Sequence, residues 1–259
     1  MGDYPIFIYS ARPSSALDIE FVTPRMELMT EILSGRINVK RVFSVFSLTM
    51  VSEVFVHIWS EKTCIVFYKE PYYDAKLTYC TRQSFRPRQY TMLHGLSYDL
   101  RLGVPSDVFD IAKLCHGFAA EAKPFVLTEE RAVEEARNLL SLNQVWVHTI
   151  KEGDQPTEIA CIVAVTRESV NVSAITKVFT NPSWRSRGCA ERLVRKVTQN
   201  LLKRKESVVL YVAHNNPAAS KVYNRVGFVG LDNSMPPVNG VDSWQEIGFD
   251  RDEVVLGHW

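Results

Sequence analysis

The residues best suited to chemistry stand together in one short segment, Arg185-Ser-Arg-Gly-Cys-Ala190. Arg185 and Arg187 bring positive charge to a turn, and Gly188 lets the backbone approach a ligand closely. A strand-like run, 172–180, precedes the segment, and a helix-like run follows it. The free N–H groups of a helix's first turn favour an anion. This order predicts a phosphate site, and the alternative is a solvated basic turn that caps a surface helix.

A second segment repeats the pattern of a strand that feeds a helix. Residues 208–212 are short, apolar and β-branched, which predicts a buried strand. The chain then runs to Pro217, which suits the first position of a helix, with Asn216 as its cap. Gly227 fits the end of that helix.

This order of elements resembles the GNAT-type N-acetyltransferases. The matching positions are Arg185, Gly188 and Ala190 on the family's pyrophosphate motif, and Asn216, Ala219, Tyr223, Gly227 and Phe228 on its second motif. The resemblance covers roughly the last 160 residues and leaves about the first 95 unexplained. A narrower likeness, to fungal acyl-CoA N-acyltransferase-like proteins, rests on the tail Leu256-Gly-His-Trp259.

The resemblance implies a binding site for acetyl-CoA or another acyl-CoA. Pantetheine is expected in a splay between two strands, beside the backbone of Val178, Phe179 and Thr180, with Asn216 and Ala219 on its other side. The pyrophosphate is expected on the turn that comprises Arg185, Ser186, Arg187, Gly188, Cys189 and Ala190. Tyr223 is the expected catalytic acid, because a nearby phenol can protonate the thiolate that leaves a thioester.

The identity of the general base stays open. Many relatives place a glutamate on the strand before the pyrophosphate turn, but 174–180 holds no carboxylate. Glu121, Glu158, His214 or a water molecule are the alternatives. Cys189 invites a nucleophilic role, because a helix N-terminus and arginines should lower its pKa. It has no evident His–Asp partner set, so we interpret it as a small buried filler.

Composition limits the other classes of function. The net charge of the 259 residues is +1, which gives no general electrostatic case for nucleic acid or an anionic membrane as the partner. The five cysteines are scattered without a Cys-x-x-Cys pair, which indicates a reducing compartment and no zinc site. The six histidines form no recognisable metal set either. We find no signal peptide or membrane span, so we expect a cytoplasmic protein. The oligomeric state is not predictable.

The pattern along the chain predicts a mixed α/β fold of the GNAT type, with a largely antiparallel central sheet flanked by helices. The polar, Pro-interrupted stretch 83–90 suggests a boundary between residues 1–90, a small α/β region that could be a degenerate half-copy, and an acyltransferase domain at 91–259. The predicted helices are 25–33, 107–121, 128–140, 188–205 and one that starts at 217. The predicted strands and strand-like runs are 41–46, 51–59, 63–68, 77–80, 97–102, 145–150, 159–166, 172–180, 208–212 and 253–256.

The function that these expectations support is transfer of an acetyl group from acetyl-CoA to a primary amine of a small molecule, by direct attack in a ternary complex. Two alternatives remain at this stage. One is a non-catalytic acyl-CoA-binding or sensing protein, which the missing strand glutamate favours. The other is a peptide or protein N-acetyltransferase.

Overall fold

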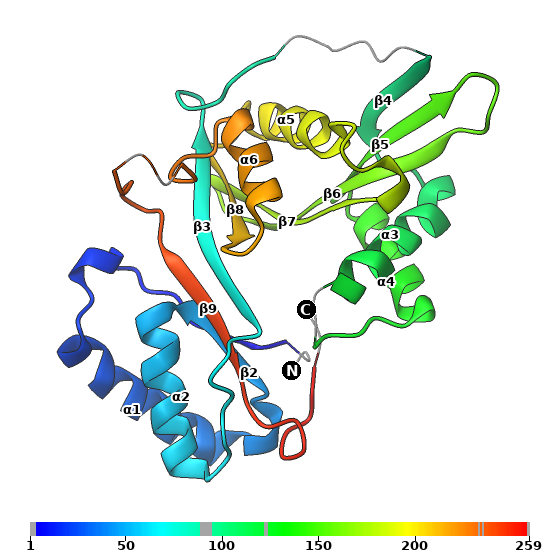
Figure 1. Cartoon of the computed structure of the whole chain (residues 1–259). Coiled ribbons are helices and arrows are strands. Elements are labelled where there is room, and N and C mark those ends of the chain that lie inside the picture. Colours follow the sequence, from blue (N-terminus) through cyan, green and yellow to red (C-terminus); the bar gives the residue numbers. More distant parts are fainter. Residues whose placement is uncertain (1–3, 89–94, 122–123, 233, 235, 258–259) are drawn as a thin grey trace. The chain divides into compact units, whose positions relative to one another are not determined.

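The structure is a computed structural model, and it describes residues 4–88, 95–121, 124–232, 234 and 236–257. Helices and strands are interspersed along the chain (Figure 1). The α-helices of the described part are α1 Ile19–Arg36, α2 Thr49–Thr63, α3 Val108–Glu121, α4 Glu129–Ser141, α5 Cys189–Leu201 and α6 Pro217–Val226. Its strands are β1 Ile6–Phe7, β2 Ser44–Leu48, β3 Tyr73–Thr81, β4 Leu96–Leu102, β5 Val145–Glu152, β6 Glu158–Glu168, β7 Val172–Thr180, β8 Ser207–Ala213 and β9 Ser243–Gly248.

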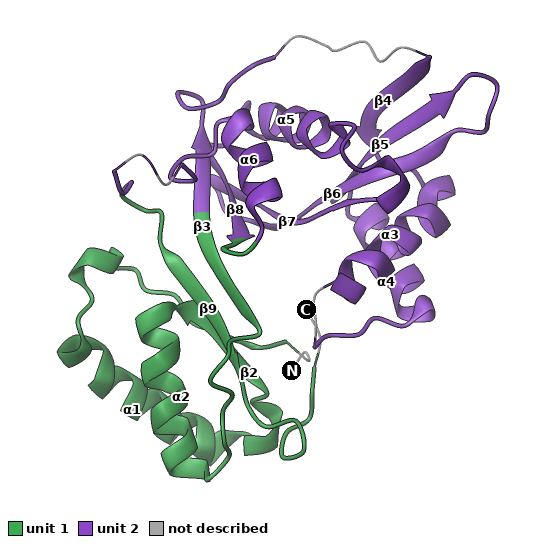
Figure 2. Cartoon of the chain, viewed as in Figure 1, with its two compact units in different colours: residues 1–77, 213–215, 239–259 green, residues 78–212, 216–238 purple. Residues whose placement is uncertain are grey.

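The chain forms two compact units (Figure 2). The first unit comprises residues 1–77, 213–215 and 239–259, and the second comprises 78–212 and 216–238. The C-terminal segment therefore belongs to the same unit as the N-terminal one. The predicted division into functional domains at residue 90 stays a prediction, and the compact units divide the chain at other positions.

In the first unit, two helices accompany strands that come from both ends of the chain. Strand β2 pairs with β1 in parallel and with β9 in antiparallel fashion, and β9 also pairs with the start of β3. Helix α2 packs against β2 and β9, and α1 packs against α2. Asp18 caps α1 by accepting a hydrogen bond from the Phe21 N–H at 2.7 Å, so the helix begins earlier than the predicted residue 25.

The prediction for 51–59 was wrong, because this strand-like run lies within α2. The buried residues of the helix are Val51, Ser52, Phe55, Val56 and Trp59, at the spacing of one helical face. The same β-branched and aromatic residues also satisfy an approximate alternation, which is why the sequence favoured a strand.

The second unit is built on five consecutive strands in the order β8-β7-β6-β5-β4. Strands β4 to β7 are antiparallel to their neighbours, and only β7 and β8 pair in parallel. This arrangement confirms the predicted mixed, largely antiparallel sheet.

Helices cover both faces of this sheet because the residues of β6 alternate between two cores. Cys161 and Val163 belong to the core beneath α5, whereas Ile162 and Ala164 belong to the core beneath α3 and α4. A strand covered on both sides needs apolar residues at every position, and residues 159–165 of β6 are all buried hydrophobic residues.

The predicted final strand at 253–256 was also wrong. The last strand is β9, ten residues earlier, whose sequence Ser-Trp-Gln-Glu-Ile-Gly carries polar residues that weaken the strand signal. Glu246 of β9 is 1% exposed, and it accepts a hydrogen bond from the Ser44 hydroxyl at 2.6 Å. The run 63–68 contributes only an isolated bridge, from Phe67 to Phe249. Within the described part of the chain, no helix has the length and apolar character needed to cross a membrane.

Candidate functional site

Strands β7 and β8 part from one another before either ends. Their parallel pairing runs from Val172 and Ser207 to Ile175 and Leu210. Strand β7 continues to Thr180 and β8 to Ala213. The separation begins at a bulge, because the register with β6 moves from Val165–Ile175 to Ala164–Lys177 and leaves Thr176 as the extra residue. A bulge bends its strand, so it accounts for the splay that the resemblance implies.

The backbone of β7 offers hydrogen-bonding groups to this opening. The Asn181 N–H donates to the Ala160 carbonyl at 2.9 Å, which fixes the alternation of the β6–β7 ladder. Residues of an antiparallel pair point their backbone groups alternately to one side and the other. The backbone of Phe179 therefore faces β6, whereas Val178 and Thr180 turn their N–H and C=O groups toward the opening.

The side chains of these residues have packing roles. Phe179 is buried against α3, where a Cβ added to Gly117 would lie 2.8 Å from its ring. Val178 is partly buried against the core on the other face of the sheet. Of the three residues predicted to hold pantetheine, Val178 and Thr180 present backbone groups to the opening, and Phe179 supports the strand from beneath.

The turn after β7 leads into α5 without a side-chain cap. Gly188 is the N-cap, at φ +73°, and Ser186 also has a positive φ of +61°. Positive φ is unusual for serine, and such residues cluster at ligand sites. Because no side chain among the described residues accepts from the first turn, the N–H groups at the start of α5 are left to bind an anion or solvent.

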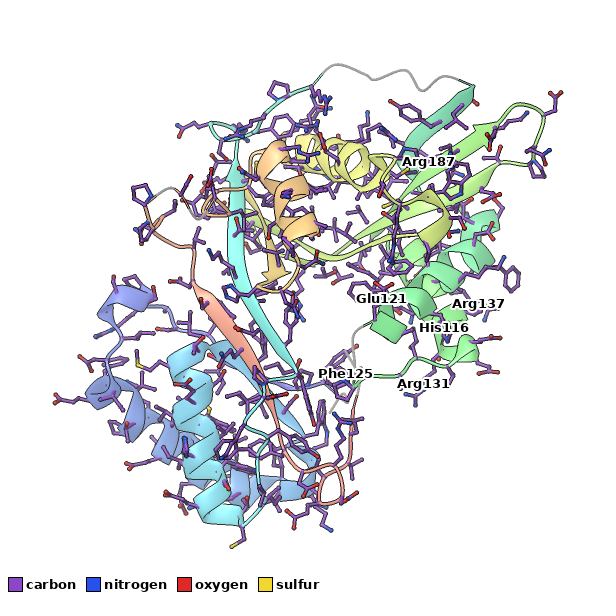
Figure 3. All side chains as sticks on the ribbon, in the orientation of Figure 1. His116, Glu121, Phe125, Arg131, Arg137 and Arg187 are labelled. Atoms are coloured by element: carbon purple, nitrogen blue, oxygen red, sulfur yellow. The ribbon has the colours of Figure 1, made fainter. Side chains whose placement is uncertain are left out.

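The two arginines of the turn contact neighbouring side chains. Arg185 donates from Nη2 to the Glu121 carboxylate at 2.6 Å and from Nε to the Thr180 carbonyl at 3.2 Å. The Arg187 guanidinium lies over the Trp184 ring, 4.7 Å from its centroid. Figure 3 shows Glu121 at the end of α3 and Arg187 at the turn before α5. The Arg185–Glu121 pair is half-exposed, so an approaching anion can compete for the guanidinium.

A third arginine, Arg192, braces the turn from within α5. Its Nη2 donates to the Arg187 carbonyl at 2.5 Å, and its Nε donates to His148 Nε2 at 3.3 Å. The guanidinium also lies over the Tyr98 ring, on which His148 stacks. Burial and the adjacent Arg192 charge lower the pKa of His148 to about 4, so the imidazole is neutral at pH 7 and accepts this bond. Neither residue was predicted as part of the site, because the only local signals are a polar residue in a predicted strand, His148, and a basic residue in a predicted helix, Arg192.

Cys189 is the first residue of α5, and its environment corrects one expectation. The thiol is buried, and burial raises its pKa above the ordinary value although Arg192 and Arg187 act in the opposite direction. The expected lowering of the pKa was therefore wrong. The residue packs in the core beneath α5, in agreement with its interpretation as filler.

The second predicted motif forms the start and the inner face of α6. The side-chain oxygen Oδ1 of Asn216 accepts from the Ala219 N–H at 3.0 Å, so the cap uses this oxygen and leaves the side-chain nitrogen to donate elsewhere. Tyr223 is 8% exposed, and its ring packs against Phe228 at a centroid distance of 5.9 Å. Gly227 ends the helix at φ +114°, where a Cβ would lie 2.2 Å from the Ser84 carbonyl oxygen.

The candidate bases have separate surroundings. Glu121 is held by Arg185, as described above, and Glu158 accepts from the Trp184 indole N–H at 2.9 Å. His214 lies in the first unit, where its Nε2 is 3.8 Å from an Asp74 carboxylate oxygen and 3.4 Å from the Ser243 hydroxyl. The general base therefore stays open.

The described residues include no group of three or more His, Cys, Asp or Glu side chains that could hold a metal ion. His94, His258 and Trp259 lie outside the described residues.

Comparisons with known proteins agree with this geometry. The family described as FR47-like protein matches residues 160–235, which include β7, the turn, α5, β8 and α6. No curated protein matches the chain.

Several solved structures have a similar fold. A GNAT-family acetyltransferase from Colwellia psychrerythraea is 12% identical at a TM-score of 0.54, over 90% of this chain and 74% of that one. A GCN5-related N-acetyltransferase from Kribbella flavida is 13% identical at a TM-score of 0.51, over 92% and 79%. A tandem GNAT protein from the clavulanic acid biosynthesis pathway is 10% identical at a TM-score of 0.53, over 86% and 68%. The narrower fungal likeness stays a prediction. The chain has the GNAT fold, and residues 160–235, which match the FR47-like family model, contain both predicted motifs.

Proposed function

We propose that this protein is an acyl-CoA-dependent N-acetyltransferase, which moves an acetyl group from acetyl-CoA to a primary amine of a small molecule. The observation that carries the proposal is the splay of β7 from β8 directly before the uncapped start of α5. The two features would serve the two parts of coenzyme A, the extended pantetheine arm and the anionic pyrophosphate. The solved structures of the same fold are named as acetyltransferases, which also supports the proposal.

Each part of the cofactor has a partner in this arrangement. Pantetheine extends between β7 and β8, where the backbone of Val178 and Thr180 takes the place of a paired strand. The pyrophosphate binds the first-turn N–H groups of α5, and Arg185 and Arg187 add positive charge. Asn216 donates its side-chain amide to the pantetheine arm.

The reaction is a direct transfer. The neutral amine nitrogen attacks the thioester carbonyl carbon, a C–N bond forms and the C–S bond breaks. Tyr223 protonates the departing thiolate, and the amine loses a proton to Glu121, Glu158, His214 or water. The protein needs no metal for this chemistry, because the thioester is already activated.

Release of free thiol tests the proposal. Wild-type protein is mixed with acetyl-CoA and a panel of primary amines, and the thiol of coenzyme A is followed with a chromogenic reagent. We expect amine-dependent release for at least one amine, and none with Gly188→Trp, whose side chain would fill the turn. Binding of acetyl-CoA without thiol release for any small amine or amino-terminal peptide would instead favour a non-catalytic sensing protein.

A further inference from the structure

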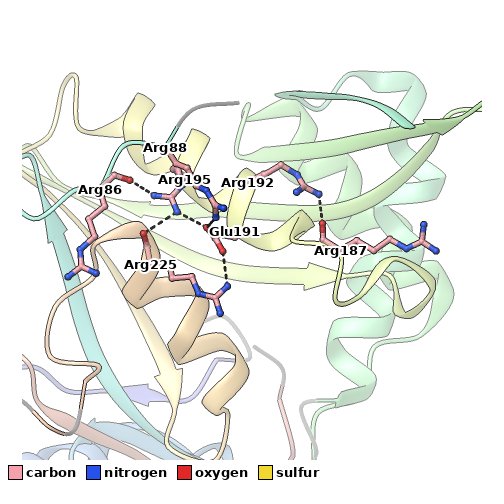
Figure 4. Close-up of polar contacts among 7 residues, drawn as sticks. All are labelled: Arg86, Arg88, Arg187, Glu191, Arg192, Arg195 and Arg225. Carbon is pink, nitrogen blue, oxygen red and sulfur yellow. Dashed lines mark hydrogen bonds and ion pairs between the residues drawn. The ribbon is translucent and has the colours of Figure 1, made fainter. Parts of the chain in front are cut away.

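A buried carboxylate at the start of α5 holds three arginines from three different parts of the second unit (Figure 4). Glu191 is 6% exposed, and its Oε1 accepts from Arg88 at 3.0 Å and from Arg195 at 2.8 Å. Its Oε2 accepts from Arg225 at 3.1 Å. Burial alone would raise the pKa of Glu191, but the hydrogen bonds from Arg195, Arg225 and Arg88 outweigh it and lower the pKa below its ordinary value.

The three arginines differ in exposure and in their hydrogen bonds. The Arg195 side chain is only 11% exposed, and it also donates to the backbone carbonyls of Arg86 and Arg225. The Arg88 and Arg225 side chains are each 60% exposed. Within the described residues each of these two donates one side-chain hydrogen bond, from Nη1 to Glu191. A guanidinium has five N–H donors, so four on each arginine have no hydrogen-bond partner among the described residues.

The cluster carries more positive charge than its structural role requires. Arg195 alone neutralises Glu191 and ties α5 to the end of α6 and to the segment at Arg86. Three guanidinium groups against one carboxylate leave two positive charges in excess. Arg88 and Arg225 supply this excess, and both are anchored on the same buried carboxylate. Planar guanidinium groups held in this way are suited to a phosphate dianion.

The position of the cluster identifies which phosphate it would bind. Glu191 is the third residue of α5, and the first turn of that helix is the pyrophosphate site of the proposed function. Coenzyme A carries a further phosphate, with two negative charges, on the 3′-oxygen of its ribose. A second anion-binding feature beside the first turn of α5 matches this chemistry.

We propose that Arg88 and Arg225 bind the 3′-phosphate of coenzyme A, and that Glu191 and Arg195 position them. The inference rests on the proposed function, since it assigns a part of the same ligand. It makes the protein selective for coenzyme A over dephospho-coenzyme A, which lacks only the 3′-phosphate.

Calorimetric titration with these two ligands tests the inference. We expect wild-type protein to bind coenzyme A about tenfold or more tightly than dephospho-coenzyme A. Arg88→Gln and Arg225→Gln should each weaken coenzyme A binding about tenfold and leave dephospho-coenzyme A binding within about twofold. Arg137→Gln, an exposed arginine of α4, is the matched control and should change neither affinity.

Three results would overturn the inference in different ways. Equal wild-type affinity for the two ligands would remove the 3′-phosphate site and leave the proposed function intact. An equal loss of affinity for both ligands in the variants would mean that the arginines only stabilise the fold of the site. Failure of the wild type to bind either ligand would overturn the proposed function itself.

Discussion

Arg192 donates a hydrogen bond from its Nε to Nε2 of His148, at 3.3 Å, and so connects the helix that begins at the anion-binding turn to the middle of β5. His148 is fully buried, and its Nδ1 has no hydrogen-bond partner among the described residues. Protonation of this imidazole would place a second positive charge directly beside Arg192. The brace under the turn therefore depends on a neutral histidine.

Acidification should destabilise the fold through His148. The pKa of this histidine is about 4 in the folded protein, against an ordinary value of 6.5, so the unfolded chain binds the proton more tightly. The contribution of neutral His148 to the free energy of unfolding is complete above pH 6.5 and is lost as the pH falls toward 4. Urea unfolding of the wild type should show a loss of about 2–3 kcal/mol in the free energy of unfolding across this range. His148→Gln cannot titrate at this position, so its loss should be much smaller. His116→Gln, at an exposed site, is the control; the same pH dependence in the wild type and His148→Gln would contradict the account.

Gly188→Ala should separate backbone strain from ligand binding. Alanine at φ +73° is strained, and its Cβ would lie 3.0 Å from Arg192 Nη1. We expect the free energy of unfolding to fall by about 1–2 kcal/mol. Gly153→Ala is the matched control, because Gly153 has φ +52° with open space around the new Cβ. Both variants should lose stability, but only Gly188→Ala should weaken acetyl-CoA binding; an equal effect on binding would mean that strain alone is responsible.

Gly117→Ala should disturb the splayed end of β7 from beneath. The added Cβ would lie 2.8 Å from two ring atoms of Phe179, a side chain only 6% exposed. Overpacking of this kind costs about 1–3 kcal/mol, so we expect a lower unfolding midpoint together with weaker acetyl-CoA binding. Gly35→Ala in α1 has open space and should stabilise the helix by about 0.5–1 kcal/mol. Unchanged binding by a destabilised Gly117→Ala would argue that the position of Phe179 does not affect the site.

Tyr223→Phe should separate chemistry from cofactor binding. The substitution keeps the ring that packs against Phe228 and removes only the hydroxyl. We expect kcat to fall about tenfold or more, and the acetyl-CoA dissociation constant to change less than about twofold. Both are measured with one amine substrate at saturating acetyl-CoA. Full activity in the variant would rule out Tyr223 as the acid.

Local chemistry explains which parts of the fold the sequence predicts well. Helix α6 has the predicted start and end, because Asn216, Pro217 and Gly227 each act on the backbone within one turn. Strand β7 likewise has its predicted bounds. The mistaken assignments are α2, whose apolar residues fit two periodicities, and β9, whose polar residues obscure its strand character.

The contacts that shape the site depend on residues far apart in sequence. The bulge at Thr176 depends on the register with β6, which no local pattern specifies. His148 and Arg192 are separated by 44 residues, and Arg88 reaches Glu191 across 103. The sequence predicted the turn and the helix start, but the brace and the arginine cluster become visible only in the folded chain.

Calorimetric titration of acetyl-CoA into the wild type and Gly188→Trp tests the central claim most directly. The account predicts saturable binding to the wild type, and at least about tenfold weaker binding to a folded variant, because the indole would occupy the turn at the start of α5. Absence of binding to the wild type, or equal binding to both proteins, would contradict the claim that this turn holds the pyrophosphate of coenzyme A.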